Sequence, residues 1–186
     1  LLGVPYATEM GGTGLDNLAY AITIEELARV SGSVAIIVSA HTSLGAGPLA
    51  IAGTPQQQER FLRPLASGAK LGAYGLTEPG AGSDSRGTKT RARRDGDEWV
   101  IDGAKQFITN AGVADIYIVA AVTERSGEGS AEGGRISAFI VEKGTPGFSF
   151  GKLLEKLGLH ASATGELVFE NCRIPAANLL GTEGEG

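Results

Sequence analysis

The sequence predicts an α+β fold in which a helical segment is followed by a β-rich segment. Before about residue 70, the chain carries helix-start signals and apolar residues at helical spacing. After that point, short apolar runs alternate with turn residues at regular intervals, which is typical of a small barrel or sandwich. The 186 residues are enough for one or two small domains with cores of their own. We therefore expect a partial helical domain over 1–70 and a β-barrel domain over 71–186.

The first helix is predicted to begin at Asp16, which can act as its N-cap, and Gly32 interrupts its pattern. The apolar residues that share a helical face are Leu18, Ile22, Leu27, Val34 and Ile37. No charged residue occurs from Val30 to Gln58, but the continuous apolar run at 34–38 is too short to cross a bilayer. We expect a helix packed deep in the protein or in an oligomer, and no membrane span.

A second helix is predicted to begin at Thr54. This threonine can be the N-cap, a proline follows it, and Gln57 lies three residues after the cap, which together form a strong start signal. The helix would run to Gly68 as its C-cap, and Pro64 would end or kink it.

The segments after residue 70 have the composition of β-strands. Residues 89–103 form two predicted strands joined around Asp95 and Gly96, where the dipeptide is a hairpin signal. Four further strands are predicted at 116–122, 135–143, 147–153 and 165–174. The connection at 124–135 is rich in glycine and glutamate, and we expect it to be mobile.

Composition and charge argue against several kinds of function. The net charge is −5 and no long run of Lys or Arg occurs, so nucleic acid is an unexpected partner. The single cysteine, Cys172, rules out an internal disulfide and a cysteine-based zinc site; we place it at a strand edge, with nothing nearby to lower its thiol pKa. His41 and His160 lack metal-ligand spacing, so we interpret both as structural and expect no metal. No signal peptide is visible, which fits an intracellular, reducing setting.

Residues 45–50, GAGPLA, match the loose dinucleotide-binding pattern G-x-G-x-x-A. However, Pro48 lies inside the pattern, and no acidic residue about 20 positions later closes a strand. We therefore favour a tight turn between two helices over a nucleotide site.

The first candidate functional segment is YGLTEPGAGSDS at 74–85, a glycine-opened turn after a strand. Its backbone N–H groups and the hydroxyls of Thr77 and Ser83 could let a flat polar ligand or a phosphate approach the backbone closely. The alternative is an ordinary strand-ending turn capped by Ser83 and Asp84, which we favour for this segment taken alone.

The second candidate segment, KQFITNAG at 105–112, changes that balance. It places Phe107 and Thr109 on one side of a short strand, because side chains two residues apart share a face. An aromatic ring beside a hydroxyl donor suits the face and the edge of a planar heterocycle. A core phenylalanine with a hydrogen-bonded threonine is the alternative.

Together these segments resemble the signature regions of the acyl-CoA dehydrogenases, flavoproteins of fatty-acid and branched-chain catabolism. GLTEPGAGSDSRG at 75–87 resembles the first signature and KQFITNAG the second. The similarity extends to 134–148, 156–181 and the N-terminal helical part, and it is closest to the short-chain, butyryl-type branch. The resemblance implies a helical domain, a β-barrel middle domain and a C-terminal helical bundle; we expect a fragment in which the last is absent.

The resemblance implies FAD as the cofactor, with its isoalloxazine ring against the middle domain. Leu76 and Thr77 would hydrogen-bond the pyrimidine edge of the ring. Thr109 would donate to the N5 region, where hydride arrives. Phe107, which stands where many members have tryptophan, would pack near the face of the ring.

Other positions of the two segments carry further implied contacts. Gly82 and Ile108 belong to the same flavin-binding segments. Tyr74 and Ser83 would line both the flavin and the thioester channel, and Ser83 would contact the CoA portion of the substrate. His160 stands where related sequences often have arginine, so that position would carry less positive charge near neutral pH.

By resemblance, the complete protein converts a short-chain or branched acyl-CoA to the trans-2-enoyl-CoA. The family's catalytic base is a glutamate of the C-terminal domain. We therefore assign no catalytic residue in this chain, neither Glu78 nor Glu166, and expect the fragment alone to be inactive.

The resemblance also implies electron-transfer flavoprotein as the electron acceptor, a homotetramer, and a location in the bacterial cytoplasm or the mitochondrial matrix. Two alternatives stay open. One is a flavin oxidase or monooxygenase on the same fold, and the other is a non-catalytic binding module that has kept the barrel.

Overall fold

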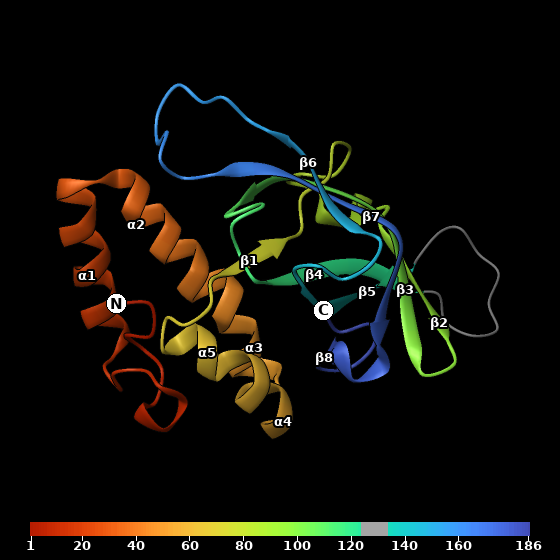
Figure 1. Ribbon diagram of the computed structural model, residues 1–186, viewed down its shortest axis with the longest axis horizontal. Helices are drawn as coiled ribbons and strands as arrows, with labels where there is room; N and C mark the ends of the chain where they lie inside the picture. The colour runs from red at the N-terminus through yellow and green to blue at the C-terminus, as the bar shows by residue number, and fades with distance from the viewer. Residues whose placement is uncertain (124–133) are drawn as a thin grey trace.

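The computed structural model describes residues 1–123 and 134–186, so the glycine- and glutamate-rich connection expected at 124–135 lies almost wholly outside the described residues. Figure 1 shows the helices gathered on one side of the molecule and the strands on the other. This is the α-then-β order predicted from the sequence.

The helical side is built from α-helices joined by wider π-helical turns. The α-helices are α1 (Asn17–Val30), α2 (Gly32–Ser39), α3 (Gly47–Ala52), α4 (Pro55–Gln57) and α5 (Arg63–Ala66). The π-helical segments are η2 (Ala40–Ala46) and η3 (Gln58–Leu62), and short 3₁₀ turns are η1 (Thr8–Met10), η4 (Ser85–Gly87) and η5 (Ala176–Asn178). Because the π-helical turns continue the α-helices on either side, α2 to α3 and α4 to α5 each form one helical stretch.

Both predicted helix starts are confirmed by their cap contacts. A side-chain oxygen of Asp16 accepts a hydrogen bond from the Ala19 amide at 2.8 Å. At the second start, the Thr54 hydroxyl oxygen accepts from the Gln57 amide at 3.2 Å, while the Gln57 side-chain oxygen accepts from the Thr54 amide at 2.9 Å. This reciprocal pair satisfies two amides that the first helical turn leaves without partners. Gly68, the predicted C-cap, has a φ of 80°.

The GAGPLA segment is not a turn between helices, so that prediction was wrong. It lies in the continuous helical stretch from α2 through η2 to α3. Glycine serves close packing here: a Cβ on Gly45 would lie 2.7 Å from the carbonyl carbon of Gly72. The absence of a side chain thus lets η2 approach the backbone of β1.

This same stretch, Gly32–Ala52, is long and apolar enough to cross a membrane by length and composition, with a mean hydropathy of 1.6. The sequence reasoning underestimated its length because it counted only the continuous apolar run at 34–38. In this molecule 44% of the apolar window is buried, and the stretch packs against α1 and β1. The predicted deep packing therefore holds for only part of the stretch, since Ile36, Leu44 and Ile51 stay exposed. A core helix satisfies the same length and hydropathy criteria as a membrane span.

The six strands predicted between residues 89 and 174 are all present, together with β1, the strand implied before the first candidate segment, and β8, which the sequence did not predict. They are β1 (Gly72–Gly75), β2 (Arg91–Asp95), β3 (Glu98–Thr109), β4 (Ile116–Thr123), β5 (Arg135–Glu142), β6 (Phe148–Leu153), β7 (Thr164–Pro175) and β8 (Leu179–Leu180). They form one sheet in the order β6-β7-β3-β2-β4-β5-β8, with β1 paired to β4 beside this path. β1 and β2 run parallel to β4, and the other pairs are antiparallel.

Strand β4 separates two apolar cores because its successive side chains point to opposite faces. Tyr117 and Val119 face a core to which β1 through β7 all contribute side chains. Ile116 and Ile118 face a second core, under the helices, which also contains Leu49, Phe61 and Leu65. Since seven strands line the first core, the sheet curls around its own interior, as expected for the predicted middle domain.

Candidate functional site

The loop that follows β1 contains the first predicted functional segment. Glu78 and Ala81 exchange two backbone hydrogen bonds, of 2.9 and 3.1 Å, which close a tight turn. A Cβ on Gly80 or Gly82 would meet no atom within 4 Å, so these glycines face open space. The predicted glycine-opened turn after a strand is therefore confirmed.

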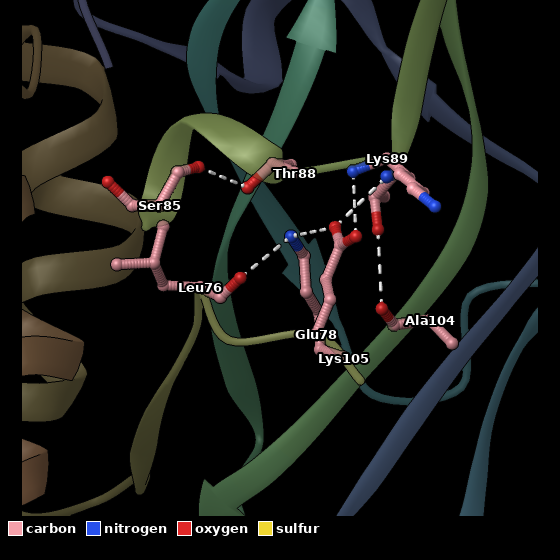
Figure 2. Close-up of polar contacts among 8 residues, drawn as sticks. Leu76, Glu78, Ser85, Thr88, Lys89, Ala104 and Lys105 are labelled. Carbon is pink, nitrogen blue, oxygen red and sulfur yellow. Dashed lines mark hydrogen bonds and ion pairs between the residues drawn. The ribbon is translucent and has the colours of Figure 1, made fainter. Parts of the chain in front are cut away.

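This loop lies against the end of β3, which contains the second predicted segment. The Gln106 amide donates a hydrogen bond to the Thr77 carbonyl oxygen at 2.8 Å. The Lys105 ammonium donates to the Leu76 carbonyl oxygen at 3.0 Å, as Figure 2 shows. The fold thus brings together the two segments that the sequence singled out separately.

A buried ion pair holds this junction. Lys105 Nζ lies 2.7 Å from Glu78 Oε1, and the two side chains are only 0% and 5% exposed. The Glu78 carboxylate also accepts from the backbone amides of Lys89 at 2.7 Å and Thr90 at 3.0 Å. In Figure 2 the Lys105 ammonium stands between this carboxylate and the Leu76 carbonyl. The pair therefore ties the loop to β3 and to the segment that leads into β2.

The electrostatics of the pair favour two opposite charges. Burial raises the pKa of the Glu78 carboxyl, but hydrogen bonds from Lys105, Thr90 and Lys89 together hold it below its usual value. Burial lowers the pKa of the Lys105 ammonium, and Glu78 offsets part of that effect. Because each charge faces its counter-ion at hydrogen-bond distance, we infer that both are ionised at neutral pH. Glu78 is thus committed to the ion pair with Lys105.

Strand β3 is irregular at Phe107. Its pairing with β7 shifts register between Lys105 and Ile108, which is a β-bulge, and Phe107 has a φ of 61°. Non-glycine residues seldom adopt that region, and such strain is common at binding sites. The Phe107 side chain is 58% exposed, so the alternative of a core phenylalanine is wrong. A bulge re-aims side chains, and here it turns an aromatic ring outward.

Three further predicted residues lie near this ring. Leu76 and Thr77 form the part of the loop that is hydrogen-bonded to β3, and Thr109 ends that strand; all three are partly buried. Ile108, in contrast, is 3% exposed and belongs to the first core. Only its backbone can therefore contact a ligand.

The remaining predicted residues come from the two ends of the first segment. Tyr74 lies in β1, where it pairs with Ile118 and packs, half-buried, against the second core. Gly82 and Ser83 follow the Glu78–Ala81 turn and are exposed. Ser83 therefore presents its hydroxyl to solvent, where a ligand can reach it.

Sequence reasoning missed the polar anchor of β1. The Gly72 amide donates to His41 Nδ1 at 2.9 Å, and Asn110 Nδ2 donates to the Gly72 carbonyl oxygen at 3.1 Å. His41 Nε2 lies 3.2 Å from the Leu65 carbonyl oxygen, so the proton is on Nε2. Burial lowers the pKa of His41 to about 4. These contacts are consistent with the structural role predicted for His41. The only sign in the sequence that it would be buried was its position in an apolar run.

Among the described residues, no hydrogen bond or ion pair joins Cys172 or His160 to the Glu78–Lys105 junction. Cys172 is fully buried in β7, where it pairs with Ile101 of β3, and burial raises its thiol pKa to about 11. His160 is exposed, with Nε2 2.6 Å from the Lys156 carbonyl oxygen, beside an open cavity of about 410 Å³. No cluster of three metal-ligating side chains occurs in residues 1–123 and 134–186.

Two protein-family models match successive parts of the chain. The family model described as the acyl-CoA dehydrogenase N-terminal domain matches residues 1–69, and the model of the middle domain matches 73–172. The short-chain specific acyl-CoA dehydrogenase of Clostridium acetobutylicum is 50% identical over the whole chain. The chain covers 48% of that relative, and thus spans about half the length of the curated relatives it matches.

Solved structures show the same arrangement. Butyryl-CoA dehydrogenase from Megasphaera elsdenii is 48% identical, with a TM-score of 0.92 over 100% of this chain and 48% of that one. A chain from a study of the electron transferring flavoprotein of Acidaminococcus fermentans gives a TM-score of 0.94 at 48% identity, with the same two coverages. An acyl-CoA dehydrogenase complexed with FAD from Bacillus anthracis gives 0.91 at 41% identity, over 100% of this chain and 31% of that one. With both family models matching successive parts of its sequence, the chain belongs to the acyl-CoA dehydrogenase family.

Proposed function

We propose that the complete protein is an FAD-dependent acyl-CoA dehydrogenase of the short-chain type. The observation that carries this proposal is the amide N–H of Thr77. Among the residues that the structure describes, this N–H has no hydrogen-bond acceptor. It lies on the loop bonded to Gln106, the neighbour of Phe107, whose backbone is strained and whose ring is exposed. A backbone donor beside an aromatic face fits the edge and the face of a flavin.

The residues at this junction have the chemistry that a flavin requires. FAD, when bound, supplies the hydride acceptor. Leu76 and Thr77 would hydrogen-bond the pyrimidine edge, Thr109 would donate near N5, and Phe107 would pack at the face. Donors at these positions stabilise the negative charge that arrives with the hydride. The Glu78–Lys105 pair holds the loop of Leu76 and Thr77 against β3 before any ligand binds, so this loop would need little rearrangement on binding.

The substrate side follows from the outer end of the loop. The exposed Ser83 would hydrogen-bond the CoA portion of a short-chain or branched acyl-CoA, and Tyr74 would line the thioester channel. An apolar channel excludes water, so that the α-proton and the β-hydride can leave to give the trans-2-enoyl-CoA. No residue of this chain is proposed as the base that removes the proton. Electrons would pass on to an electron-transfer flavoprotein, and the protein would act as a homotetramer.

Anaerobic titration of the protein encoded by the complete gene tests the proposal. The visible spectrum should show oxidised flavin, and butyryl-CoA should bleach it. Thr109→Val, which removes the hydroxyl with little change of shape, should slow bleaching by about tenfold or more. Thr145→Val is the matched control, because its hydroxyl serves a turn at the Glu142 carbonyl.

Other results would replace parts of this proposal. Bleaching only by longer acyl-CoAs would change the substrate class, and bleaching only by branched acyl-CoAs would remove the short-chain assignment. Substrate-dependent oxygen consumption at a rate comparable to flavin reduction would indicate an oxidase. A protein that holds no flavin even when FAD is added would be a binding module.

A further inference from the structure

Lys105 makes a contact that a structural ion pair does not need. Its ammonium donates to Glu78 Oε1 at 2.7 Å and also to the Leu76 carbonyl oxygen at 3.0 Å. Glu78 already anchors the loop without it, through the amides of Lys89 and Thr90. Burying two charges is costly, and an ion pair with 0% and 5% exposed side chains is weak evidence for a stabilising role. The contact with the carbonyl therefore calls for a different explanation.

The Leu76 carbonyl and the Thr77 amide belong to one peptide group. A cation on the oxygen of a peptide group withdraws electron density from its nitrogen, so the N–H becomes a stronger donor. In the part of the chain that the structure describes, the Thr77 N–H has no acceptor of its own. The polarised donor is therefore available to a ligand.

We propose that Lys105 is a positioning residue that polarises the Leu76–Thr77 peptide group and so strengthens the Thr77 N–H as a donor to the pyrimidine edge of the flavin. This inference rests on the proposed function, because it takes flavin as the ligand. Lys105 acts through the peptide group and touches no ligand itself. A stronger donor at that edge favours the reduced flavin, which carries more negative charge there.

Glu78 has the opposite electrostatic effect in this scheme. Its carboxylate fixes the Lys105 ammonium within reach of the Leu76 carbonyl, but it also neutralises part of the charge. Removing either partner breaks the same ion pair. The two removals should nevertheless shift the reduction potential of the bound flavin in opposite directions, whereas loss of a purely structural pair would shift it in one direction.

The test compares three variants of the complete protein loaded with FAD, at mildly acidic pH so that Lys105 stays protonated. Lys105→Met should lower the equilibrium constant for two-electron flavin reduction about tenfold, which is about 30 mV. Glu78→Gln should raise it; this variant keeps one oxygen for the Thr90 amide and the Lys105 ammonium, while its NH2 group replaces the oxygen that accepts from the Lys89 amide. The double variant buries no unpaired charge, so it controls for folding, and its equilibrium constant should fall below that of the wild type.

A second readout needs no flavin. In the apoprotein labelled with ¹⁵N-threonine, loss of the cation in Lys105→Met and in the double variant should shift the Thr77 amide proton upfield. A wild-type protein that binds no FAD would refute the proposed function, and this shift would still test the polarisation. Equal potentials in the wild type and the double variant, potentials that move the same way in both single variants, or an unchanged Thr77 resonance would each overturn the inference.

Discussion

Acid is expected to destabilise this protein partly through His41, the buried histidine that joins the helical side to β1. The neutral ring accepts a hydrogen bond from the Gly72 amide at Nδ1. Protonation would turn this acceptor into a donor facing another donor. Burial is the main cause of the lowered pKa of about 4, and the hydrogen bond with the Leu65 carbonyl opposes it.

The sign and size of the effect follow from the two pKa values. An unfolded chain binds a proton at His41 near pH 6.5, and the folded protein only near pH 4. Titration of His41 therefore leaves the free energy of unfolding unchanged above about pH 6.5. Between about pH 6.5 and about pH 4, the unfolded chain binds a proton that the folded protein does not, so the free energy of unfolding falls. The difference between the two pKa values corresponds to about 3 kcal/mol of unfolding free energy.

The matched variant is His41→Asn, whose side-chain oxygen can take the place of Nδ1 as the acceptor for Gly72 but does not titrate. Urea unfolding of both proteins, at about pH 7 and about pH 4, gives the change in unfolding free energy with pH for each. Carboxylates titrate in both proteins, so their contribution cancels in the comparison. The wild type should lose about 3 kcal/mol more than the variant on acidification.

Two outcomes would refute this reasoning. If both proteins lose the same free energy between these pH values, His41 does not sense pH in the folded state. If the variant is the more acid-sensitive of the two, the ring is already protonated in the native protein, and the assigned Nδ1 acceptor is incorrect.

Two further predictions concern buried positions. Gly45→Ala should lower the unfolding free energy by about 1–3 kcal/mol in a denaturant titration, because its Cβ would lie 2.7 Å from the Gly72 backbone; Gly80→Ala, where a Cβ meets no atom within 4 Å, is the control, and equal stability of the two variants would contradict the close approach. Cys172 should resist iodoacetamide in the native protein at mildly alkaline pH and react once urea unfolds it, because it is fully buried with a thiol pKa of about 11; rapid native labelling in a mass-spectrometric assay would show that the core opens there.

The parts of the fold that local chemistry decides were predictable from the sequence. The Asp16 and Thr54 caps depend on residues within three positions of each other, and a short sequence pattern contains all of that information. The strands were predictable for the same reason, since alternation and turn residues are local. The order of the strands in the sheet was not predictable, because the parallel pairing of β2 with β4 depends on residues far apart in the chain.

The errors have a common physical cause, which is that a distant element overrides a local preference. Glycine at position 45 suggests a break between helices, but the helix continues, and glycine is required there because the backbone of Gly72 lies so close. The bulge against β7 at Phe107 was likewise not predicted, because this segment has the pattern of a regular strand. No local pattern indicates either effect.

The candidate site was found only in part for the same reason. Thr77, Phe107 and Thr109 were recognisable because hydroxyls and an aromatic ring stand out in glycine-rich or strand-like segments. The Lys105–Glu78 pair was not, although both residues lie in the segments singled out. Nothing in either segment indicates that the two charges meet across 27 positions of the chain.

The pairing of β1 with β4 has a consequence for the order in which this chain acquires structure. The helices pack on β1, but β1 gains its ladder only when residues from 116 onward are present. Gln57 likewise donates to the carbonyl oxygens of Ala177 and Leu179, about 120 positions later. On the ribosome, the helical segment is therefore synthesised well before its packing partners, and its apolar faces stay exposed to chaperones and to other nascent chains until the last strands emerge.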